Sequence, residues 1–230
     1  MSKKSKNRVF LFAGRDDWQK DTGLNHVLVN YTKKKNYKIV WEDPAGGFTY
    51  KLRLIESHYK NIPAIIKKLN LRLSQILYAL IHWSYFIYLY EQIFNRKEKD
   101  LVKLRCKKLK KRIQELSIEN EVVIISRSSG GRVSSFIADE LKIKHIICLG
   151  YPFQNPDNGV EPERYLHLEH LKTPMLIIQG INDEYGGSEI KEKYKFSPNI
   201  GLYFVDADHS FNVDANTWNE IYHQIDNAIG

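Results

Sequence analysis

The stretch Glu-Val-Val-Ile-Ile-Ser-Arg-Ser-Ser-Gly-Gly-Arg, residues 121–132, decides the fold of this chain. Its run of four β-branched residues, Val122 to Ile125, predicts a strand that is buried on both faces of a parallel sheet. The next segment, 133–141, has the apolar spacing of a helix. A tight turn therefore joins this strand to this helix, and Ser128 lies at its centre.

The turn is similar to the Gly-x-Ser-x-Gly pattern, which raises a nucleophilic serine at the carboxyl edge of a sheet. Ser128 takes the serine position and Gly130 the second glycine, whereas Ser126 replaces the first glycine. At the N-terminus of the following helix, backbone N–H groups and the helix dipole favour a developing oxyanion. The alternative interpretation of this stretch is an ordinary Gly-Gly turn with incidental serines.

Strands and helices alternate along the rest of the chain. Apolar runs predict further strands at 8–13, 37–41, 145–149, 174–179 and 201–205. Helical spacing predicts helices at 22–34, 99–116 and about 212–229. This alternation predicts a three-layer α/β fold with about six parallel strands in the spatial order 2-1-3-4-5-6. A single domain over residues 1–230 is expected at this length.

Three predicted strands end in side chains that together form a catalytic pattern. Ser128 follows the third strand, Asp183 the fifth and His209 the sixth. Because parallel strands present their carboxyl ends at one edge of a sheet, these side chains are expected to meet there. Ser, Asp and His in this chain order form the triad of α/β hydrolases. Asp206 and Asp208 flank His209 and are alternative acid partners, although Asp183 is preferred.

The expected chemistry is acyl transfer to water from an ester, a thioester or a similar small-molecule acyl substrate. The oxyanion hole would use the backbone N–H of Ser129 and one N–H from the loop after the first strand. Gly14 and Arg15 are the candidates for this second donor.

Several blocks of sequence resemble a known family. The segments 126–133 (Ser-Arg-Ser-Ser-Gly-Gly-Arg-Val), 148–153 (Cys-Leu-Gly-Tyr-Pro-Phe), 171–183 and 208–211 are similar to motifs of a group of small α/β hydrolases. The group includes dienelactone-hydrolase-like bacterial proteins and the hydrolase-like domains of the testis-expressed and NSL-complex subunit 3 proteins. The resemblance implies the α/β-hydrolase fold and assigns Ser128, Asp183 and His209 as the triad. Ala13-Gly14-Arg15 stands where the family has a His-Gly pair.

About seventy residues separate the second and third strands, far more than the dozen or so that a crossover needs. A helical cap or insertion is therefore expected at about 57–97 within the domain. Its segment 71–94 is rich in apolar and aromatic residues, and 73–90 contains no Asp, Glu, Lys or Arg. The favoured interpretation is a cap over the active site. A homo-oligomer contact, a partner surface or a membrane-surface contact are alternatives, and a transmembrane helix is disfavoured because the segment is interrupted by polar residues.

The composition gives no indication of a metal, a cofactor or a nucleic-acid partner. Cys106 and Cys148 form no metal-binding motif, and Cys148 is expected to be a buried thiol. The formal charge of the chain, +8, equals that of residues 96–112 alone, which contain ten Lys or Arg and two acidic residues. The helix predicted at 99–116 is interpreted as a crossover helix with a solvated basic face. The alternative is a face that docks on phosphate, anionic lipid or an acidic partner. A cytoplasmic location is expected, since no signal-peptide core follows the basic N-terminus.

The favoured function is thus a cytoplasmic serine hydrolase of the esterase or thioesterase class. Two other functions stay open at this point. One is a hydrolase-like binding or scaffold protein without catalysis, and the other is a membrane-surface hydrolase that acts on lipid-linked material.

Overall fold

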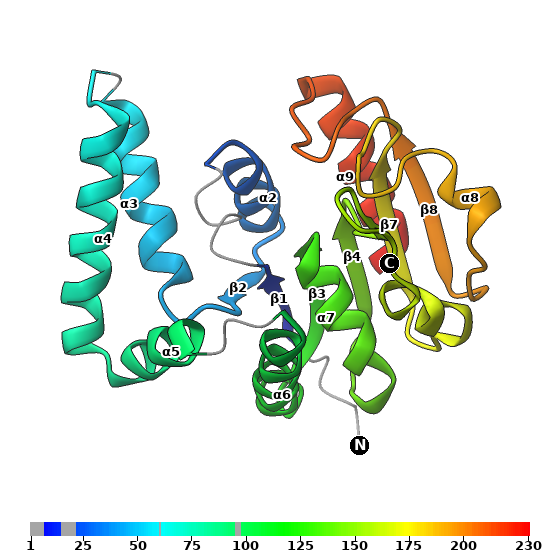
Figure 1. Ribbon diagram of the computed structural model, residues 1–230, viewed down its shortest axis with the longest axis horizontal. Coiled ribbons are helices and arrows are strands. Elements are labelled where there is room, and N and C mark those ends of the chain that lie inside the picture. The colour runs from blue at the N-terminus through cyan, green and yellow to red at the C-terminus, as the bar shows by residue number, and fades with distance from the viewer. Residues whose placement is uncertain (1–6, 15–21, 60, 95–97) are drawn as a thin grey trace.

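The computed structural model describes residues 7–14, 22–59, 61–94 and 98–230. Its centre is a six-stranded sheet in the order β2-β1-β3-β4-β7-β8, in which each pair of neighbours is parallel (Figure 1). The strands are β1 (Asn7–Ala13), β2 (Lys38–Trp41), β3 (Asn120–Arg127), β4 (His145–Leu149), β7 (Met175–Gly180) and β8 (Ile200–Val205). The predicted spatial order of the six strands and the α/β class are confirmed.

Helices cover both faces of the sheet. Val122 and Ile124 of β3 pack in one core with α6 (Glu98–Leu116) and α7 (Ser129–Ile137). Val123 and Ile125 point to the other face and pack in a second core with α2 (Thr22–Lys34) and α9 (Ala215–Ile229). Because successive strand residues face opposite ways, the apolar run of β3 fills both cores, as the sequence predicts.

The strand-to-helix turn is a single residue long. β3 ends at Arg127 and α7 begins at Ser129, which leaves Ser128 alone between them. A side chain on Gly130 would place its Cβ 2.1 Å from the Ala13 carbonyl oxygen, so only glycine lets α7 start this close to β1. Ser126 is tolerated at the position of the first glycine because its Oγ donates to the Ile147 carbonyl at 3.0 Å.

A helix that the sequence analysis did not predict follows β2. The segment 43–47, Asp-Pro-Ala-Gly-Gly, has the composition of a chain break, but α3 (Gly46–His58) begins inside it. The Asp43 carboxylate accepts the Ala45 N–H at 2.7 Å and so turns the chain into the helix. A Cβ on Gly46 would lie 2.7 Å from Trp41 Cβ, so this glycine lets the helix start against the end of β2.

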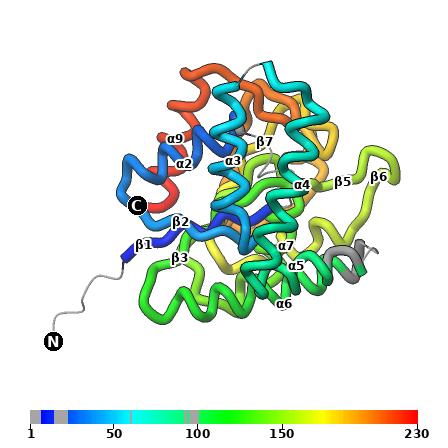
Figure 2. Tube along the Cα trace, turned by 90° about the vertical axis from the view of Figure 1, so that its left-hand side faces the viewer, coloured from blue at the N-terminus to red at the C-terminus, as the bar shows by residue number. Residues whose placement is uncertain are grey.

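The apolar segment 71–94 belongs to two helices, α4 (Ala64–Ile81) and α5 (Trp83–Phe94), separated by His82 in an extended conformation. We call α3, α4 and α5 the helical arm. Figure 1 shows α3 and α4 beyond the β2 edge of the sheet, and Figure 2 shows them side by side. None of the helices in the described ranges is both long enough and apolar enough to cross a membrane.

Smaller elements complete the chain. They are η1 (Ala138–Glu140), β5 (Gln154–Asn155), β6 (Gly159–Val160), η2 (Pro162–Arg164), η3 (Leu166–His170) and α8 (Ile190–Lys193).

His167 in η3 packs against α7. Its Nε2 lies 2.8 Å from Ser135 Oγ, and its ring stacks on Phe136 at a centroid distance of 4.1 Å. Burial, together with the charge of Arg132, lowers the pKa of His167 to about 4. The folded protein therefore disfavours a proton that His167 binds at about pH 6.5 in the unfolded chain.

We expect the free energy of unfolding to fall as the pH falls from about 6.5 to about 4, because protonation of His167 then favours the unfolded chain. His167→Gln should weaken this pH dependence, measured by urea unfolding at about pH 7 and about pH 5. It should not abolish it, since burial and Lys144 also lower the pKa of His145 to about 4. The control is His170→Gln, an exposed position of the same helix. An equal change in both variants would contradict the assignment.

Candidate active site

Ser128 has the backbone geometry of a strained turn. Its φ of 49° and ψ of −122° are unusual for a residue with a side chain. Its N–H donates to the Leu149 carbonyl at 3.2 Å, which ties the turn to the end of β4. The adjacent Arg127 donates from Nη2 to the carbonyl of His209 at 3.0 Å. The tip of β3 is thus fastened both to β4 and to the segment that carries His209.

Asp183 and His209 form a hydrogen-bonded pair. Asp183 lies after β7 and His209 after β8, and His209 Nδ1 is 2.9 Å from Asp183 Oδ2. The Asp183 side chain is fully buried and also accepts from Gln179 Nε2 at 3.0 Å and from the Tyr185 N–H at 2.8 Å. Because a carboxylate offers only acceptors, His209 donates from Nδ1. In the neutral imidazole, Nε2 is then free to accept a proton.

Gly150 connects the serine turn to this pair. It follows β4 with a φ of 64°, directly after the Leu149 carbonyl that holds Ser128. A Cβ on Gly150 would lie 3.1 Å from His209 Nδ1 and 3.2 Å from Asp183 Oδ2, so a side chain would press on both. The ends of β3, β4, β7 and β8 therefore meet around Gly150. Although both residues are described, Ser128 Oγ and His209 form no hydrogen bond with each other in this structure.

The two other carboxylates near His209 have different partners. Asp206 accepts from Asn182 Nδ2 at 3.2 Å, and Asp208 accepts from the Ser210 N–H at 2.8 Å. Of these three acids, Asp183 is the one that the structure brings into contact with the imidazole of His209.

The candidates for the oxyanion hole differ in their surroundings. Ser129 is the first residue of α7, so its N–H has no acceptor within the helix. The N–H of Gly14 donates to Glu42 Oε2 at 2.9 Å and so points at a carboxylate. Arg15 lies outside the described residues.

A buried ion pair supports this edge of the site. Arg105 of α6 donates from Nε and Nη2 to the two carboxylate oxygens of Glu42, each at 2.7 Å. Both side chains are less than a tenth exposed. Burial alone would disfavour the charged guanidinium, but Glu42 raises the pKa of Arg105 above its ordinary value. Arg105 Nη1 also donates to Ser129 Oγ at 3.0 Å, so the pair links the loop after β1 to the first residue of α7.

The sequence analysis did not identify Glu42 and Arg105 as site residues, although the sequence position of each one indicates such a role. Glu42 directly follows a strand, at the edge where reactive groups gather. Arg105 stands four residues from both Leu101 and Leu109, which places it on the apolar face of α6 and not on the basic one. The predicted solvated face is borne by Lys103, Lys107 and Lys111, which are exposed.

Cys148 does not compete with Ser128 as a nucleophile. As predicted, it is a fully buried thiol, and its Sγ would lie 2.2 Å from a Cβ on Gly131. Burial raises the pKa of the Cys148 thiol to about 12. The reactive thiolate is therefore scarcely populated at neutral pH.

This fold and this arrangement of Ser128, Asp183 and His209 define the class of α/β-hydrolase-fold proteins. A profile of the family described as "Alpha/beta hydrolase domain" matches residues 56–229, and the chain belongs to that family. The matched range also includes residues 57–114, which contain none of the motif segments that carry the resemblance to the family. No curated protein matches the sequence.

Solved structures of similar fold cover nearly the whole chain. A protein of the alpha/beta hydrolase superfamily from Xanthomonas campestris pv. campestris has a TM-score of 0.52 at 9% identity, covering 96% of this chain and 98% of its own. An alpha-beta serine hydrolase homologue from Coxiella burnetii has a TM-score of 0.51 at 13% identity, covering 100% and 88%. A Pyrococcus furiosus esterase has a TM-score of 0.51 at 15% identity, covering 98% and 85%. At these identities the likeness shows the shared fold.

Arg105→Met should lower the free energy of unfolding by about 3–5 kcal/mol, because it leaves the Glu42 carboxylate buried without its cation. Denaturant unfolding measures this loss. Lys107→Met, an exposed position of the same helix, is the control and should change it by no more than about 0.5 kcal/mol.

The double variant Glu42→Gln, Arg105→Met should lose less than the sum of the two single losses, because no unpaired charge remains buried. Strictly additive losses would show that the two side chains act independently.

Proposed function

We propose that this protein is a serine hydrolase that transfers an acyl group from an ester, a thioester or a similar substrate to water. The observation that carries the proposal is the hydrogen bond from His209 to the buried carboxylate of Asp183, at the same sheet edge as the strained turn of Ser128. Neither feature is needed for a parallel sheet to form. Membership of the hydrolase family and the esterase of similar fold support the proposal.

In the proposed reaction, Ser128 Oγ attacks the acyl carbonyl while His209 Nε2 takes the hydroxyl proton. The tetrahedral intermediate collapses, and the leaving group departs with the proton from His209. Water then attacks the acyl-serine ester in the same way and restores Ser128. Asp183 holds the imidazole with Nε2 free and stabilises its cation after each proton transfer.

The Ser129 N–H is one proposed donor to the oxyanion. The second comes from the segment after β1, as in the sequence prediction. The Gly14 N–H could donate to an oxyanion only after its hydrogen bond to the Glu42 carboxylate breaks. The N–H of Arg15 is therefore the simpler candidate. Arg105 contributes indirectly, because it neutralises a carboxylate that would otherwise disfavour negative charge nearby.

A second candidate function is a hydrolase-like binding protein without catalysis. Two observations favour it: Ser128 and His209 are not hydrogen-bonded, and the Gly14 N–H is occupied. Catalytic hydrogen bonds are often long in structures without ligand, so the first observation does not decide between the two functions. Covalent labelling of Ser128 does decide.

A fluorophosphonate probe should label the protein, because it forms a stable adduct with a serine that is activated by a neighbouring base. Ser128→Ala should abolish the label, measured by intact-protein mass spectrometry. Ser210→Ala, an exposed serine next to His209, is the control and should be labelled like the parent chain. A folded parent chain that resists the probe would favour the binding protein.

Asp183→Asn should slow probe labelling and ester hydrolysis by about 10³–10⁴-fold, because an amide can hold the imidazole in the wrong tautomer. The rate of labelling measures this effect. Asp208→Asn, which removes a carboxylate that the imidazole does not contact, is the matched control and should have little effect. Comparable slowing in both variants would argue against Asp183 as the partner of His209.

A further inference from the structure

The outer surface of the helical arm is apolar. In the described part of the chain, nineteen large hydrophobic side chains are exposed, and thirteen of them lie on α4 and α5. These thirteen are Ile65, Ile66, Leu69, Leu73, Ile76, Leu77, Leu80, Ile81, Trp83, Phe86, Ile87, Tyr90 and Phe94. Monomeric soluble proteins seldom expose so many apolar side chains side by side, so this surface is expected to bind a partner. We call it the arm surface.

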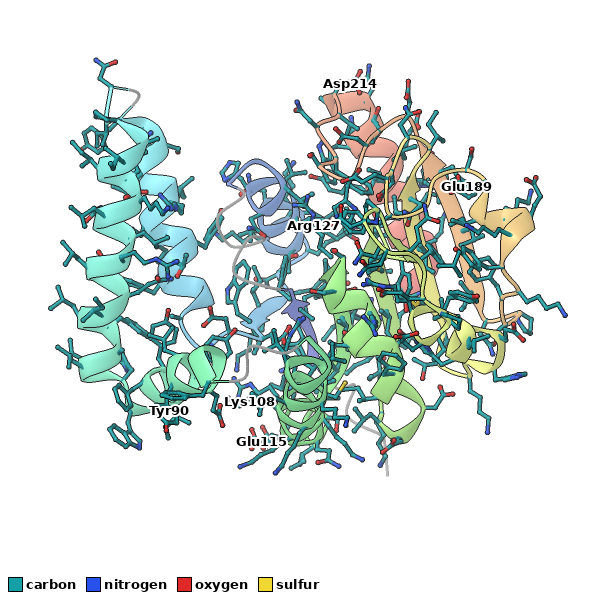
Figure 3. All side chains as sticks on the ribbon, viewed as in Figure 1. Tyr90, Lys108, Glu115, Arg127, Glu189 and Asp214 are labelled. Atoms are coloured by element: carbon teal, nitrogen blue, oxygen red, sulfur yellow. The ribbon has the colours of Figure 1, made fainter. Side chains whose placement is uncertain are left out.

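On α4 the arm surface forms one continuous face. Leu71 and Ala79 are buried on the packed side of the helix. Leu73, Leu77 and Leu80 recur at spacings of three to four residues and are 53%, 61% and 75% exposed. Figure 3 shows side chains of α4 extending away from the rest of the molecule. Over the eighteen residues of α4, this face is about 27 Å long.

On α5 the exposed side is aromatic. Tyr85 and Tyr88 are buried in a small core with Ala79, whereas Trp83 and Tyr90 on the opposite side are 70% and 54% exposed. Figure 3 shows Tyr90 on the outer side of this helix. Tryptophan and tyrosine are the side chains that collect at the boundary between lipid and water.

Polar contacts fix the arm in this arrangement. Glu56 of α3 is buried and accepts from Arg53 Nη1 at 2.6 Å and from Asn70 Nδ2 of α4 at 2.8 Å. Phe48 of α3 stacks on Tyr78 of α4 at a centroid distance of 4.7 Å. Because α4 is held by its polar and aromatic side, its aliphatic side is left outward.

The charged residues of the stretch 57–90, which includes all of α4, are of one sign. Residues 57–90 contain no Asp or Glu but four basic residues, Lys60, Lys67, Lys68 and Arg72. Lys68 and Arg72 are exposed. Arg72 is three residues from Leu69 and four from Ile76, so it borders the apolar face of α4. An anionic surface complements this border.

We propose that the arm surface docks on the headgroup region of an anionic lipid bilayer, with α4 lying in the plane of the surface. Leucine, isoleucine and aromatic side chains on one face, with lysine and arginine at its border, are the composition of helices that bind there. A second copy of the chain fits less well. A symmetric contact through the same face would bring two basic borders together with no acid within 57–90 to neutralise them.

The test is flotation of the full chain with vesicles of equal parts phosphatidylcholine and phosphatidylserine, beside vesicles of phosphatidylcholine alone. The parent chain should float with the anionic vesicles. Leu73→Gln with Leu77→Gln and Leu80→Gln should lower the partition coefficient at least about a hundredfold, because apolar area that would enter the bilayer is lost. Lys68→Gln with Arg72→Gln should lower it by roughly tenfold or more, mainly on anionic vesicles.

The matched control makes the same change at three exposed apolar positions away from the arm. The positions are Ile118, Val160 and Leu166, whose side chains are 74%, 50% and 52% exposed. The variant Ile118→Gln, Val160→Gln, Leu166→Gln should float like the parent chain. Light scattering gives the mass of each variant in solution. The proposal would be overturned if the parent chain did not float, if the triple leucine variant floated as well as the parent, or if the parent bound neutral vesicles as well as anionic ones. It would also be overturned if the parent chain were a dimer that, among the variants, only the triple leucine variant dissociates.

Discussion

The close approach of α7 to the end of β1 is the constraint on which the site depends. At Gly130 there is no room for a Cβ beside the Ala13 carbonyl, and the chain turns within the single residue between β3 and α7. That residue, Ser128, takes up the backbone strain. Tight packing between a helix and a strand thus sets the position of the proposed nucleophile.

The polar side chains around this turn form two hydrogen-bonded pairs, one on either side of it, and the carboxylate of each pair is buried. Asp183 with His209 lies toward β7 and β8, whereas Glu42 with Arg105 lies toward β1 and β2. A buried charge is costly unless a partner compensates it. The first pair is suited to move a proton, and the second keeps a carboxylate neutralised beside the loop after β1. The two pairs have different roles in the proposed mechanism because the imidazole of His209 can accept a proton at Nε2 and return it, whereas the guanidinium of Arg105 has no acceptor atom.

The helical arm follows a different physical rule from the sheet. In the sheet, apolar residues alternate between two covered faces, so nearly all of them are buried. On α4, apolar residues occupy more of the circumference than α3 and α5 cover, and an uncovered face is the result. The sequence predicted an apolar helical insertion here. The division into α4 and α5 at His82, and which side stays exposed, depend on packing that periodicity alone does not reveal.

The sequence by itself determined the order of the six strands, the turn at Ser128 and the placement of Asp183 and His209 after strands. These follow from local rules, since apolar runs and their punctuation specify strands, and parallel strands share one carboxyl edge. Only the tertiary structure decided the hydrogen bond between Asp183 and His209, the ion pair between Glu42 and Arg105, and the outward face of α4. Each of these depends on which segments, far apart in the chain, lie side by side in the folded protein. The local pattern of side chains does not specify those neighbours.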